Sequence, residues 1–514
     1  MKSKATGTMA VGRILKNSAI RYHNKEAVYC VTTGQRFSYL QLNERTNRLA
    51  NGLMDLGIKK GDKVAFLVTN RHEIIETFFA IAKTGIVGLP LNYRLIGKEI
   101  AQMMALTNAK VLIFEATFTK VAEYVHQQLP GVQTYIGIGK GIPGFALDYE
   151  TLISKSSPSE PTVEIRDEDD FYMNLTSGTT GLPKSYMLTH YNNAVAVSEM
   201  TMLFKLTEDD VVLTVFPMFG RTGYAWMASS IYIGVKNVIM NFEPKIVLEI
   251  IQSERVTISN WVPAMATFVL SVPEFAKYDL SSLRGLIFAG AAFPIPLQEQ
   301  VRLQICPYLY EYYGMQETGW IVVATPKDKM KKPASQGKIA PCVEFRIVDG
   351  SGNDVPTGTV GEIIAKSVAG ITSYYKNEAQ TKETFKNGWC HTGDLGYLDE
   401  EGYLYLSGRS KDMIVTGGQN VFSAEVENVL ISHPAVADCT VIGLPDEKWG
   451  EAITAVIAKN PGVEAKEEDI INFCKKEMAG FKVPKKIIWY EGEIPRTPTG
   501  KVMKYVLVEK YSKK

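Results

Sequence analysis

Hydrophobic and polar positions in the first third of the chain alternate between short apolar runs and amphipathic stretches. Residues 64–68, 111–114 and 135–137 are compact apolar runs typical of strands, whereas residues 73–83 and 98–106 have the spacing of helices. This rhythm is that of βαβ units. It predicts a parallel sheet covered by helices.

Local end signals define one helix more closely. Ser38 and Gln41 have the spacing of a capping box, and Gly57 stands where a helix commonly ends in a left-handed residue. Leucines between them, at 42, 49 and 53, supply an apolar face. We therefore expect a helix over residues 38–57 with a structural role.

The alternation resumes later in the chain and then changes character. Residues 211–288 repeat the strand and helix rhythm, which predicts a second sheet in a large N-terminal part. Beyond about residue 410 the pattern becomes compact, with helices at 424–432 and 467–478 and strands at 437–444 and 452–458. We expect an α/β protein with a large domain at 1–409 and a small α+β domain at 410–514.

Size and composition agree with a globular protein of more than one domain. The chain has 514 residues, and single cores stop growing near roughly 250–300 residues. Hydrophobic residues make up 46% and charged residues 22%, which is ordinary for globular domains. Lys and Arg total 56 against 55 for Asp and Glu. This interspersed balance argues against a nucleic-acid partner.

Cysteine usage and hydropathy indicate a cytoplasmic location without integral membrane association. The six cysteines are widely spaced and form no CxxC pair, so neither a zinc site nor a disulfide framework is expected. The most apolar stretch, residues 78–91, is interrupted by Lys83 and is shorter than the roughly 18 residues of a membrane span.

The strongest chemical signal is LTSGTTGLPKSYMLTH, residues 175–190. Glycines let the backbone approach an anion, hydroxyls and backbone N–H groups donate to its oxygens, and Lys184 adds a positive charge. Leu182 and Pro183 separate the last glycine from Lys184, so this is not the Walker pattern. A phosphate-binding loop of another type is indicated.

Three further segments accompany this loop in order: EYYGMQETG at 311–319, HTGDLGYLDEEGYLYLSGRSKD beginning at 391, and IPRTPTGK at 494–501. Together they resemble the adenylate-forming superfamily, in its acyl-CoA synthetase branch, over about residues 11–501. The resemblance implies two sheets sandwiched by helices, a smaller β-barrel-like subdomain and a mobile C-terminal domain. It implies an AMP-forming acyl-CoA synthetase that uses ATP, Mg²⁺ and coenzyme A.

The resemblance also assigns roles to individual positions. Tyr313 would stack on adenine, Asp394 would bind the ribose, and Lys184, Glu317 and Lys501 would be catalytic, with Glu317 and Thr176 at the metal. The full ATP-binding set is Thr176, Ser177, Gly178, Thr179, Thr180, Lys184, Ala291, Glu311, Tyr312, Tyr313, Gln316, Asp394, Arg409 and Lys501. The acyl-binding set is Phe219, Gly220, Arg221, Trp226, Trp261, Gly290 and Gly314. Gly417 and Gly418 would line the coenzyme A entrance, and Lys411 would be the hinge.

Two positions depart from the family pattern. Gly220 stands where the family commonly has a histidine, and Gln316 replaces a threonine. The missing imidazole would have steered the substrate carboxylate, and we expect Arg221 to compensate by pairing with a carboxylate. The glycine also reshapes the acyl pocket, which favours a bulky ring or a second acidic group in the substrate. His190 is expected to be structural.

The predicted reaction joins a medium-chain, alicyclic or aromatic acid to coenzyme A through an acyl-adenylate. One alternative is a standalone adenylation enzyme that loads an acyl group on a carrier protein. Another is a catalytically silent member of the fold, although Lys184, Glu317, Asp394 and Lys501 are all present. The expected partners are small molecules, and the sequence leaves open whether the chain is a monomer or a homodimer.

Overall fold

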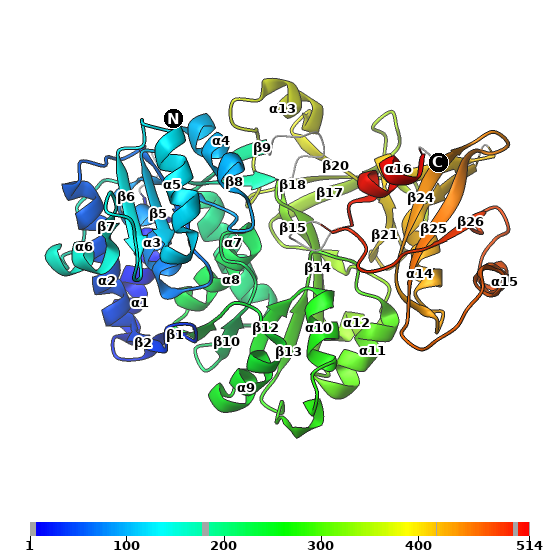
Figure 1. Ribbon diagram of the computed structural model, residues 1–514, viewed down its shortest axis with the longest axis horizontal. Coiled ribbons are helices and arrows are strands. Elements are labelled where there is room, and N and C mark those ends of the chain that lie inside the picture. Colours follow the sequence, from blue (N-terminus) through cyan, green and yellow to red (C-terminus); the bar gives the residue numbers. More distant parts are fainter. Residues whose placement is uncertain (1–6, 177–183, 418, 497–501, 513–514) are drawn as a thin grey trace.

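The computed structural model describes residues 7–176, 184–417, 419–496 and 502–512, which form four sheets (Figure 1). The first sheet has seven strands and is parallel except for its last pair. Its strands, in spatial order, are β7 (Leu147–Asp148), β6 (Thr134–Ile138), β5 (Val111–Glu115), β3 (Lys63–Leu67), β4 (Val87–Pro90), β8 (Asp170–Thr176) and β9 (Lys184–Thr189).

The second sheet has nine strands. It is parallel from β14 to β1 and antiparallel at both edges. The order is β16 (Lys338–Ile339), β15 (Gly319–Ala324), β14 (Leu309–Met315), β13 (Gly285–Phe288), β12 (Ile258–Trp261), β10 (Val211–Thr214), β11 (Lys236–Ile239), β1 (Glu26–Cys30) and β2 (Gln35–Ser38). The two predicted sheets are therefore confirmed.

Helices pack between these two sheets and on their outer faces. The inner core joins residues of both sheets to six helices: α1 (Gly12–Tyr22), α2 (Tyr39–Asp55), α3 (His72–Thr84), α6 (Tyr149–Lys155), α7 (His190–Leu203) and α8 (Arg221–Tyr232). The outer face of the nine-stranded sheet is covered by α9 (Pro244–Glu254), α10 (Pro263–Leu270) and α11 (Ile295–Gln304). The outer face of the seven-stranded sheet is covered by α4 (Gly97–Thr107) and α5 (Thr119–Gln128).

The predicted helix 38–57 is observed as α2. Ser38 and Gln41 make both hydrogen bonds of the capping box. Gly57 has a φ of +82°, and its N–H and that of Ile58 bond back to Met54 and Leu53 in a Schellman motif. Both end signals therefore act as predicted.

Lys83, the charged residue in the most apolar stretch of the sequence, has polar partners inside the protein. Every residue of α3 is buried, so its lysine needs partners inside the protein. Lys83 Nζ donates to Asn43 and Asn47 at 2.6 Å and to Glu160 at 2.9 Å. Burial lowers the pKa of Lys83 to about 8, although Glu160 acts in the opposite direction. No helix in the described ranges has both the length and the apolar character to cross a bilayer.

A smaller antiparallel sheet of five strands follows the nine-stranded sheet. It contains β17 (Val343–Val348), β18 (Gly361–Ser367), β19 (Phe385–Lys386), β20 (Trp389–Leu398) and β21 (Leu404–Arg409). Two short helices flank this region, α12 (Pro326–Lys331) and α13 (Glu378–Thr384). This sheet is the predicted small subdomain, and in the described residues its path stays open between β17 and β21.

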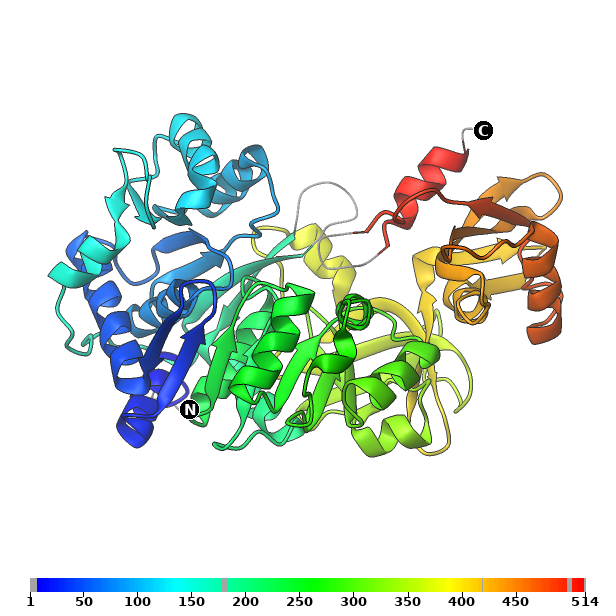
Figure 2. The same cartoon turned by 60° about the horizontal axis from the view of Figure 1, so that its bottom comes forward.

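The C-terminal part lies at one end of the molecule and has its own sheet and two cores (Figure 2). One face of its sheet packs on α14 (Ser423–Leu430) and α15 (Glu467–Glu477), and the other on α16 (Lys504–Ser512). The strands are β22 (Met413–Thr416), β23 (Gln419–Phe422), β24 (Val436–Asp446), β25 (Gly450–Lys459) and β26 (Lys486–Trp489). The chain passes from one sheet to the other at 410–412, beside the predicted boundary.

Candidate active site

The candidate site lies where adjacent parallel strands end. Segments that follow β10, β12, β13 and β14 meet at the carboxyl edge of the nine-stranded sheet because these strands are neighbours and run in one direction. Such edges are the usual ligand sites of open α/β sheets. The predicted residues Gly220, Gly290, Ala291 and Gln316 all lie on these segments.

Two clusters of polar side chains stand beside this edge. The first, which we call the Asp394 cluster, consists of Tyr313, Asp394 and Arg409. Tyr313 Oη donates to Asp394 Oδ2 at 2.7 Å, and Arg409 Nε donates to Asp394 Oδ1 at 2.9 Å. Asp394 and Arg409 face each other directly across β20 and β21, so sheet register sets their contact.

The second cluster, the Glu317 cluster, consists of Glu317, Tyr374 and Lys184. Glu317 lies in the turn between β14 and β15 and is only 7% exposed. Tyr374 Oη donates to its Oε1 at 2.7 Å, and Lys184 Nζ lies 5.1 Å from the centroid of the Tyr374 ring. Burial and the Glu317 carboxylate raise the pKa of Tyr374 well above its usual value, so its hydroxyl stays a donor.

The charges of the Glu317 cluster suit a nucleotide and a hard cation. Among the described residues, Glu317 has no salt-bridge partner, and neither has Lys184. No group of three or more His, Cys, Asp or Glu side chains in the described part could hold a metal. Mg²⁺ is commonly held by one or two carboxylates together with substrate phosphates and water. A single buried carboxylate near a lysine fits that mode of binding.

Several predicted positions fall at or beyond the edge of what the structure describes. Ser177, Gly178, Thr179, Thr180, Gly418 and Lys501 lie outside the described residues. Thr176 is the last residue of β8, and its backbone pairs with Lys184. The roles assigned to these positions remain predictions.

Two of the predicted ATP-binding side chains have structural contacts here. The Glu311 carboxylate pairs with Lys329 Nζ at 2.6 Å inside the core, and burial raises its pKa. Tyr312 points to the opposite face of β14, where its hydroxyl accepts from Asn260 at 3.4 Å. The predicted contacts of these two residues with ATP remain predictions.

Gln316 is anchored from the seven-stranded sheet. Tyr186 Oη donates to Gln316 Oε1 at 2.6 Å. The amide that replaces the usual threonine is therefore held by a neighbouring tyrosine on β9. Nothing in the sequence pattern around Tyr186 indicated this partner.

The guanidinium of Arg221 contacts backbone carbonyl groups of the protein. It is buried, and its guanidinium donates to the carbonyl oxygens of Gln316 and Ala369. It thus joins the start of α8 to the turn that carries Glu317. The expected pairing of Arg221 with a carboxylate remains a prediction.

The remaining predicted acyl residues differ in their surroundings. A Cβ placed on Gly220 would meet, among the described residues, only the carbonyl oxygen of Pro217, at 3.5 Å. One on Gly314 would lie 1.9 Å from the carbonyl oxygen of Gly319, so glycine is needed where the paired backbones of β14 and β15 approach closely. Phe219 is half-buried and packs edge-on against Tyr93, with ring centroids 5.2 Å apart. Tyr93 was not predicted.

Trp226 and Trp261 are core residues. Both are fully buried, in separate cores on opposite faces of the nine-stranded sheet. Their indole N–H groups donate to Leu213 O at 3.3 Å and to Ser259 Oγ at 2.8 Å. Their predicted contact with an acyl group therefore remains a prediction without direct support.

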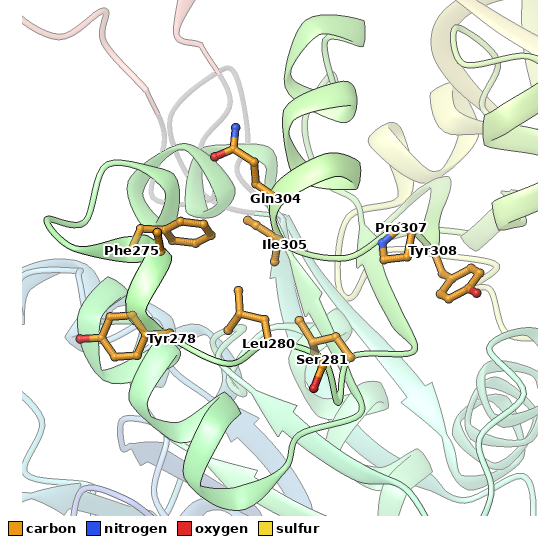
Figure 3. A pocket seen from close by; sticks show the side chains of 10 residues that line it. Phe275, Tyr278, Leu280, Ser281, Gln304, Ile305, Pro307 and Tyr308 are labelled. Atoms are coloured by element: carbon orange, nitrogen blue, oxygen red, sulfur yellow. The ribbon is translucent and has the colours of Figure 1, made fainter.

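A mostly apolar cavity of about 620 Å³ lies elsewhere, where β13 and β14 begin (Figure 3). In Figure 3 the side chains of Leu280 and Ile305 face each other across it. Because strands begin and end at opposite edges of the sheet, this cavity is remote from the candidate site. Its lining is Phe275, Ala276, Tyr278, Leu280, Ser281, Leu283, Gln304, Ile305, Pro307 and Tyr308.

The predicted hinge and coenzyme A positions lie around the change of sheet. Lys411 is in a 3₁₀ turn at Ser410–Asp412. Burial lowers its pKa, and the charges of Arg409 and Lys184 act in the same direction. Gly417 has a φ of +57° and packs against Trp449. These placements leave both predicted roles open.

His190 has the structural role that was predicted. It is fully buried, stacks on Phe171 and accepts a hydrogen bond from the Val11 N–H at its Nδ1, 3.1 Å away. Burial lowers its pKa to about 4. The imidazole is therefore neutral at neutral pH, as its acceptor role requires.

Comparison with known proteins identifies the class. Residues 15–375 match the family model of the AMP-binding enzyme, and residues 425–501 match that of the AMP-binding enzyme C-terminal domain. The chain belongs to this family of adenylate-forming enzymes. The predicted fold and family, in the acyl-CoA synthetase branch, are confirmed.

Individual relatives cover nearly the whole chain. Long-chain-fatty-acid–CoA ligase FadD13 of Mycobacterium tuberculosis is 35% identical over 506 residues, 98% of each chain. Fatty acid–[acyl-carrier-protein] ligase ScoC of Streptomyces coeruleorubidus is 32% identical, over 94% of this chain and 93% of ScoC. The structure of anthranilate CoA ligase AuaEII with anthranoyl-AMP superposes with a TM-score of 0.92 at 28% identity, over 98% of this chain and 97% of that one.

Proposed function

We propose that this protein is an AMP-forming acid–CoA ligase. It converts ATP, a carboxylic acid and coenzyme A into acyl-CoA, AMP and pyrophosphate through an acyl-adenylate. The observation that carries the proposal is the meeting of residues from three sheets: Lys184 from the first, Tyr313 and Glu317 from the second, and Asp394 from the third. A relative that is similar over its whole length, FadD13, is named a CoA ligase.

The first half-reaction activates the acid. A carboxylate oxygen attacks the α-phosphorus of ATP, and the bond to the β-phosphate oxygen breaks, so pyrophosphate leaves with the electron pair. Lys184 and Lys501 lie in segments that would offset negative charge on the phosphates. Mg²⁺, when held by Glu317, would supply further positive charge on the phosphate oxygens. The Asp394 cluster would hold the nucleoside.

The second half-reaction transfers the acyl group. The coenzyme A sulfur attacks the adenylate carbonyl, the bond to the phosphate oxygen breaks, AMP leaves, and the thiol proton passes to solvent. We propose that the C-terminal domain turns about Lys411 between the two half-reactions and brings Gly417 to the thiol's entrance. The position of Lys411 between two independent sheets supports a hinge there.

For the acyl group we propose a bulky ring in preference to a dicarboxylate. Open space beside Gly220 supports a wide substrate, and the contacts of Arg221 leave the guanidinium facing backbone carbonyls. Turnover of benzoate, cyclohexane carboxylate, adipate and hexanoate measures this preference. A preference for adipate would contradict it.

A second function has one specific observation in its favour. The relative ScoC is named a ligase to acyl-carrier protein, so the acyl group could pass to a carrier's pantetheine. Both functions share adenylation and differ only in the thiol. The acceptor therefore has to be tested directly.

The deciding experiment follows pyrophosphate and AMP release from ATP, Mg²⁺ and a panel of acids, with and without coenzyme A. Acyl-CoA and AMP should appear together only with coenzyme A, and Lys501→Ala should remove pyrophosphate formation. Lys510→Ala, in α16, is the matched control and should behave like the parent. Pyrophosphate without acyl-CoA would point to a carrier protein, and no pyrophosphate on any acid would end both proposals.

The proposal includes a cytoplasmic location. All six cysteines are free, and five are buried, which supports the reducing cytoplasm. A homodimer is the assembly that we would test for, by light scattering after size exclusion.

A further inference from the structure

One segment of the five-stranded sheet region connects the two sides of the Glu317 cluster. We call residues 369–375 the bridging segment. The Ile371 N–H donates to the carbonyl oxygen of Glu317 at 2.8 Å, and the Tyr375 N–H donates to the carbonyl oxygen of Ser185 at 2.7 Å. The bridging segment is thus tied both to the turn that bears Glu317 and to the residue after Lys184.

Tyr374 is the residue of this segment whose side chain contacts both charges. Its hydroxyl bonds to the Glu317 carboxylate, and its ring faces the Lys184 ammonium. Tyr374 is 4% exposed, its N–H donates to Thr381 Oγ1 at 3.0 Å, and its ring packs on Phe385. Packing and backbone contacts therefore leave the side chain little freedom to turn.

The hydroxyl and the ring through which Tyr374 contacts Glu317 and Lys184 are both uncharged. A hydroxyl donor restricts the rotamers of a buried carboxylate without neutralising it, and an aromatic face attracts an ammonium while leaving its N–H donors available. A cationic partner for Glu317 or an anionic partner for Lys184 would compete with Mg²⁺ and phosphate. Tyr374 can hold both groups in place and leave their charges for a ligand.

We propose that Tyr374 is a positioning residue of the nucleotide site. Its hydroxyl orients Glu317 toward Mg²⁺, and its ring holds Lys184 toward the phosphates. This inference rests on the proposed function, because it assumes that Mg²⁺ and ATP bind at this site. It adds a residue that none of the sequence motifs above includes.

Two substitutions separate the roles of the hydroxyl and the ring. Tyr374→Phe removes the donor to Glu317 and keeps the ring, whereas Tyr374→Leu removes both. Tyr375→Phe is the matched control, since it removes a neighbouring hydroxyl from the same segment. Thermal unfolding of each variant first establishes that it is folded, and the retained ring in Tyr374→Phe preserves the packing on Phe385.

The readout is binding of α,β-methylene ATP, measured by calorimetry over a range of free Mg²⁺ and in EDTA. Loss of a hydrogen bond to a metal ligand typically costs about 10-fold in metal affinity or more. Tyr374→Phe should therefore raise the half-saturating Mg²⁺ concentration about 10-fold and leave binding in EDTA unchanged. Tyr374→Leu should in addition weaken binding in EDTA about 3-fold, through loss of the cation–π contact.

Four results would overturn the proposal. An unchanged Mg²⁺ requirement in Tyr374→Phe, or the same change in Tyr375→Phe, would remove the role of the hydroxyl. Tighter binding by Tyr374→Leu in EDTA would mean that the ring withholds Lys184 from the phosphates. If the parent protein bound the analogue without any response to Mg²⁺, the metal role of Glu317 would be wrong and Tyr374 would have nothing to position. Normal Mg²⁺ dependence in the parent would instead leave the proposed function intact whatever the variants do.

Discussion

The Asp394 cluster and the Glu317 cluster differ in how their charges are satisfied. Asp394 meets a guanidinium and a phenol, so its charge is compensated within the protein. Among the described residues, Glu317 has a phenol and no cation as its side-chain partner, and Lys184 contacts an aromatic face and no carboxylate. In the Asp394 cluster the carboxylate charge is compensated without a ligand. In the Glu317 cluster the negative charge of Glu317 and the positive charge of Lys184 have no oppositely charged partner among the described residues.

The Asp394 cluster therefore contributes shape to the site, whereas the Glu317 cluster contributes charge. A compensated cluster presents fixed hydrogen-bonding groups, which suits a neutral nucleoside. An uncompensated pair gains most from a ligand that brings opposite charges, such as Mg²⁺ with phosphate. The two clusters should therefore respond differently to substitution and to the metal.

The largest effect is expected for Glu317→Gln. The amide keeps the shape and can still accept from Tyr374, but it loses the charge that would hold a cation. Removing one preorganised electrostatic group from an active site lowers turnover by about 100- to 1,000-fold. Pyrophosphate formation at saturating ATP measures this loss, with the exposed Glu344→Gln as control. A change within about threefold would mean that Glu317 holds no catalytic cation.

A smaller effect is expected for Asp394→Asn. The substitution leaves Arg409 without its carboxylate and weakens the acceptor of Tyr313, and hydrogen bonds to a charged group contribute about 1.5–3 kcal/mol. Affinity for AMP should fall about 10-fold, by the same factor with Mg²⁺ and with EDTA. Calorimetry in both conditions tests this independence. A loss that appears only with Mg²⁺ would show that the two clusters act as one.

The smallest effect on activity is expected for Arg221→Met. Two buried carbonyls, of Gln316 and Ala369, would lose their donor, which should destabilise the fold by about 2–4 kcal/mol in denaturant unfolding. The ratio of kcat/KM for adipate to that for hexanoate should not change, because the guanidinium faces the protein backbone. Arg166→Met, at an exposed ion pair, is the control. A selective loss of adipate turnover would show that Arg221 pairs with the second carboxylate of the substrate.

The sequence pattern predicted helices and strands correctly where the residues that contact one another are also close in sequence. The strand predicted at 111–114 is observed at Val111–Glu115, and the helix at 73–83 is observed as His72–Thr84. Backbone periodicity and helix ends depend on contacts within about four residues, which a single sequence contains. The phosphate-loop motif was equally local, although its centre lies outside the described residues.

Side-chain partners were predictable only in part. Tyr313, Glu317 and Asp394 were named from motifs, but the contact between Tyr313 and Asp394 spans 81 positions. Tyr374, 57 positions from Glu317, carried no recognisable signal, and nothing in the motifs indicated that Arg221 would contact the carbonyl oxygens of Gln316 and Ala369. Such contacts depend on how sheets pack, which hydrophobic periodicity does not encode.

The class of fold, the family and the chemical groups available to the reaction follow from periodicity and from short motifs, which a single sequence contains. Tertiary structure decided which of those groups meet. In the part of the chain that the structure describes, the fold satisfied the charge of Asp394 within the protein and left Glu317 and Lys184 with neutral partners, since strand register and the bridging segment bring together residues that are far apart in the chain. The physical reason is that charge compensation depends on distance in space, and only the folded chain sets that distance.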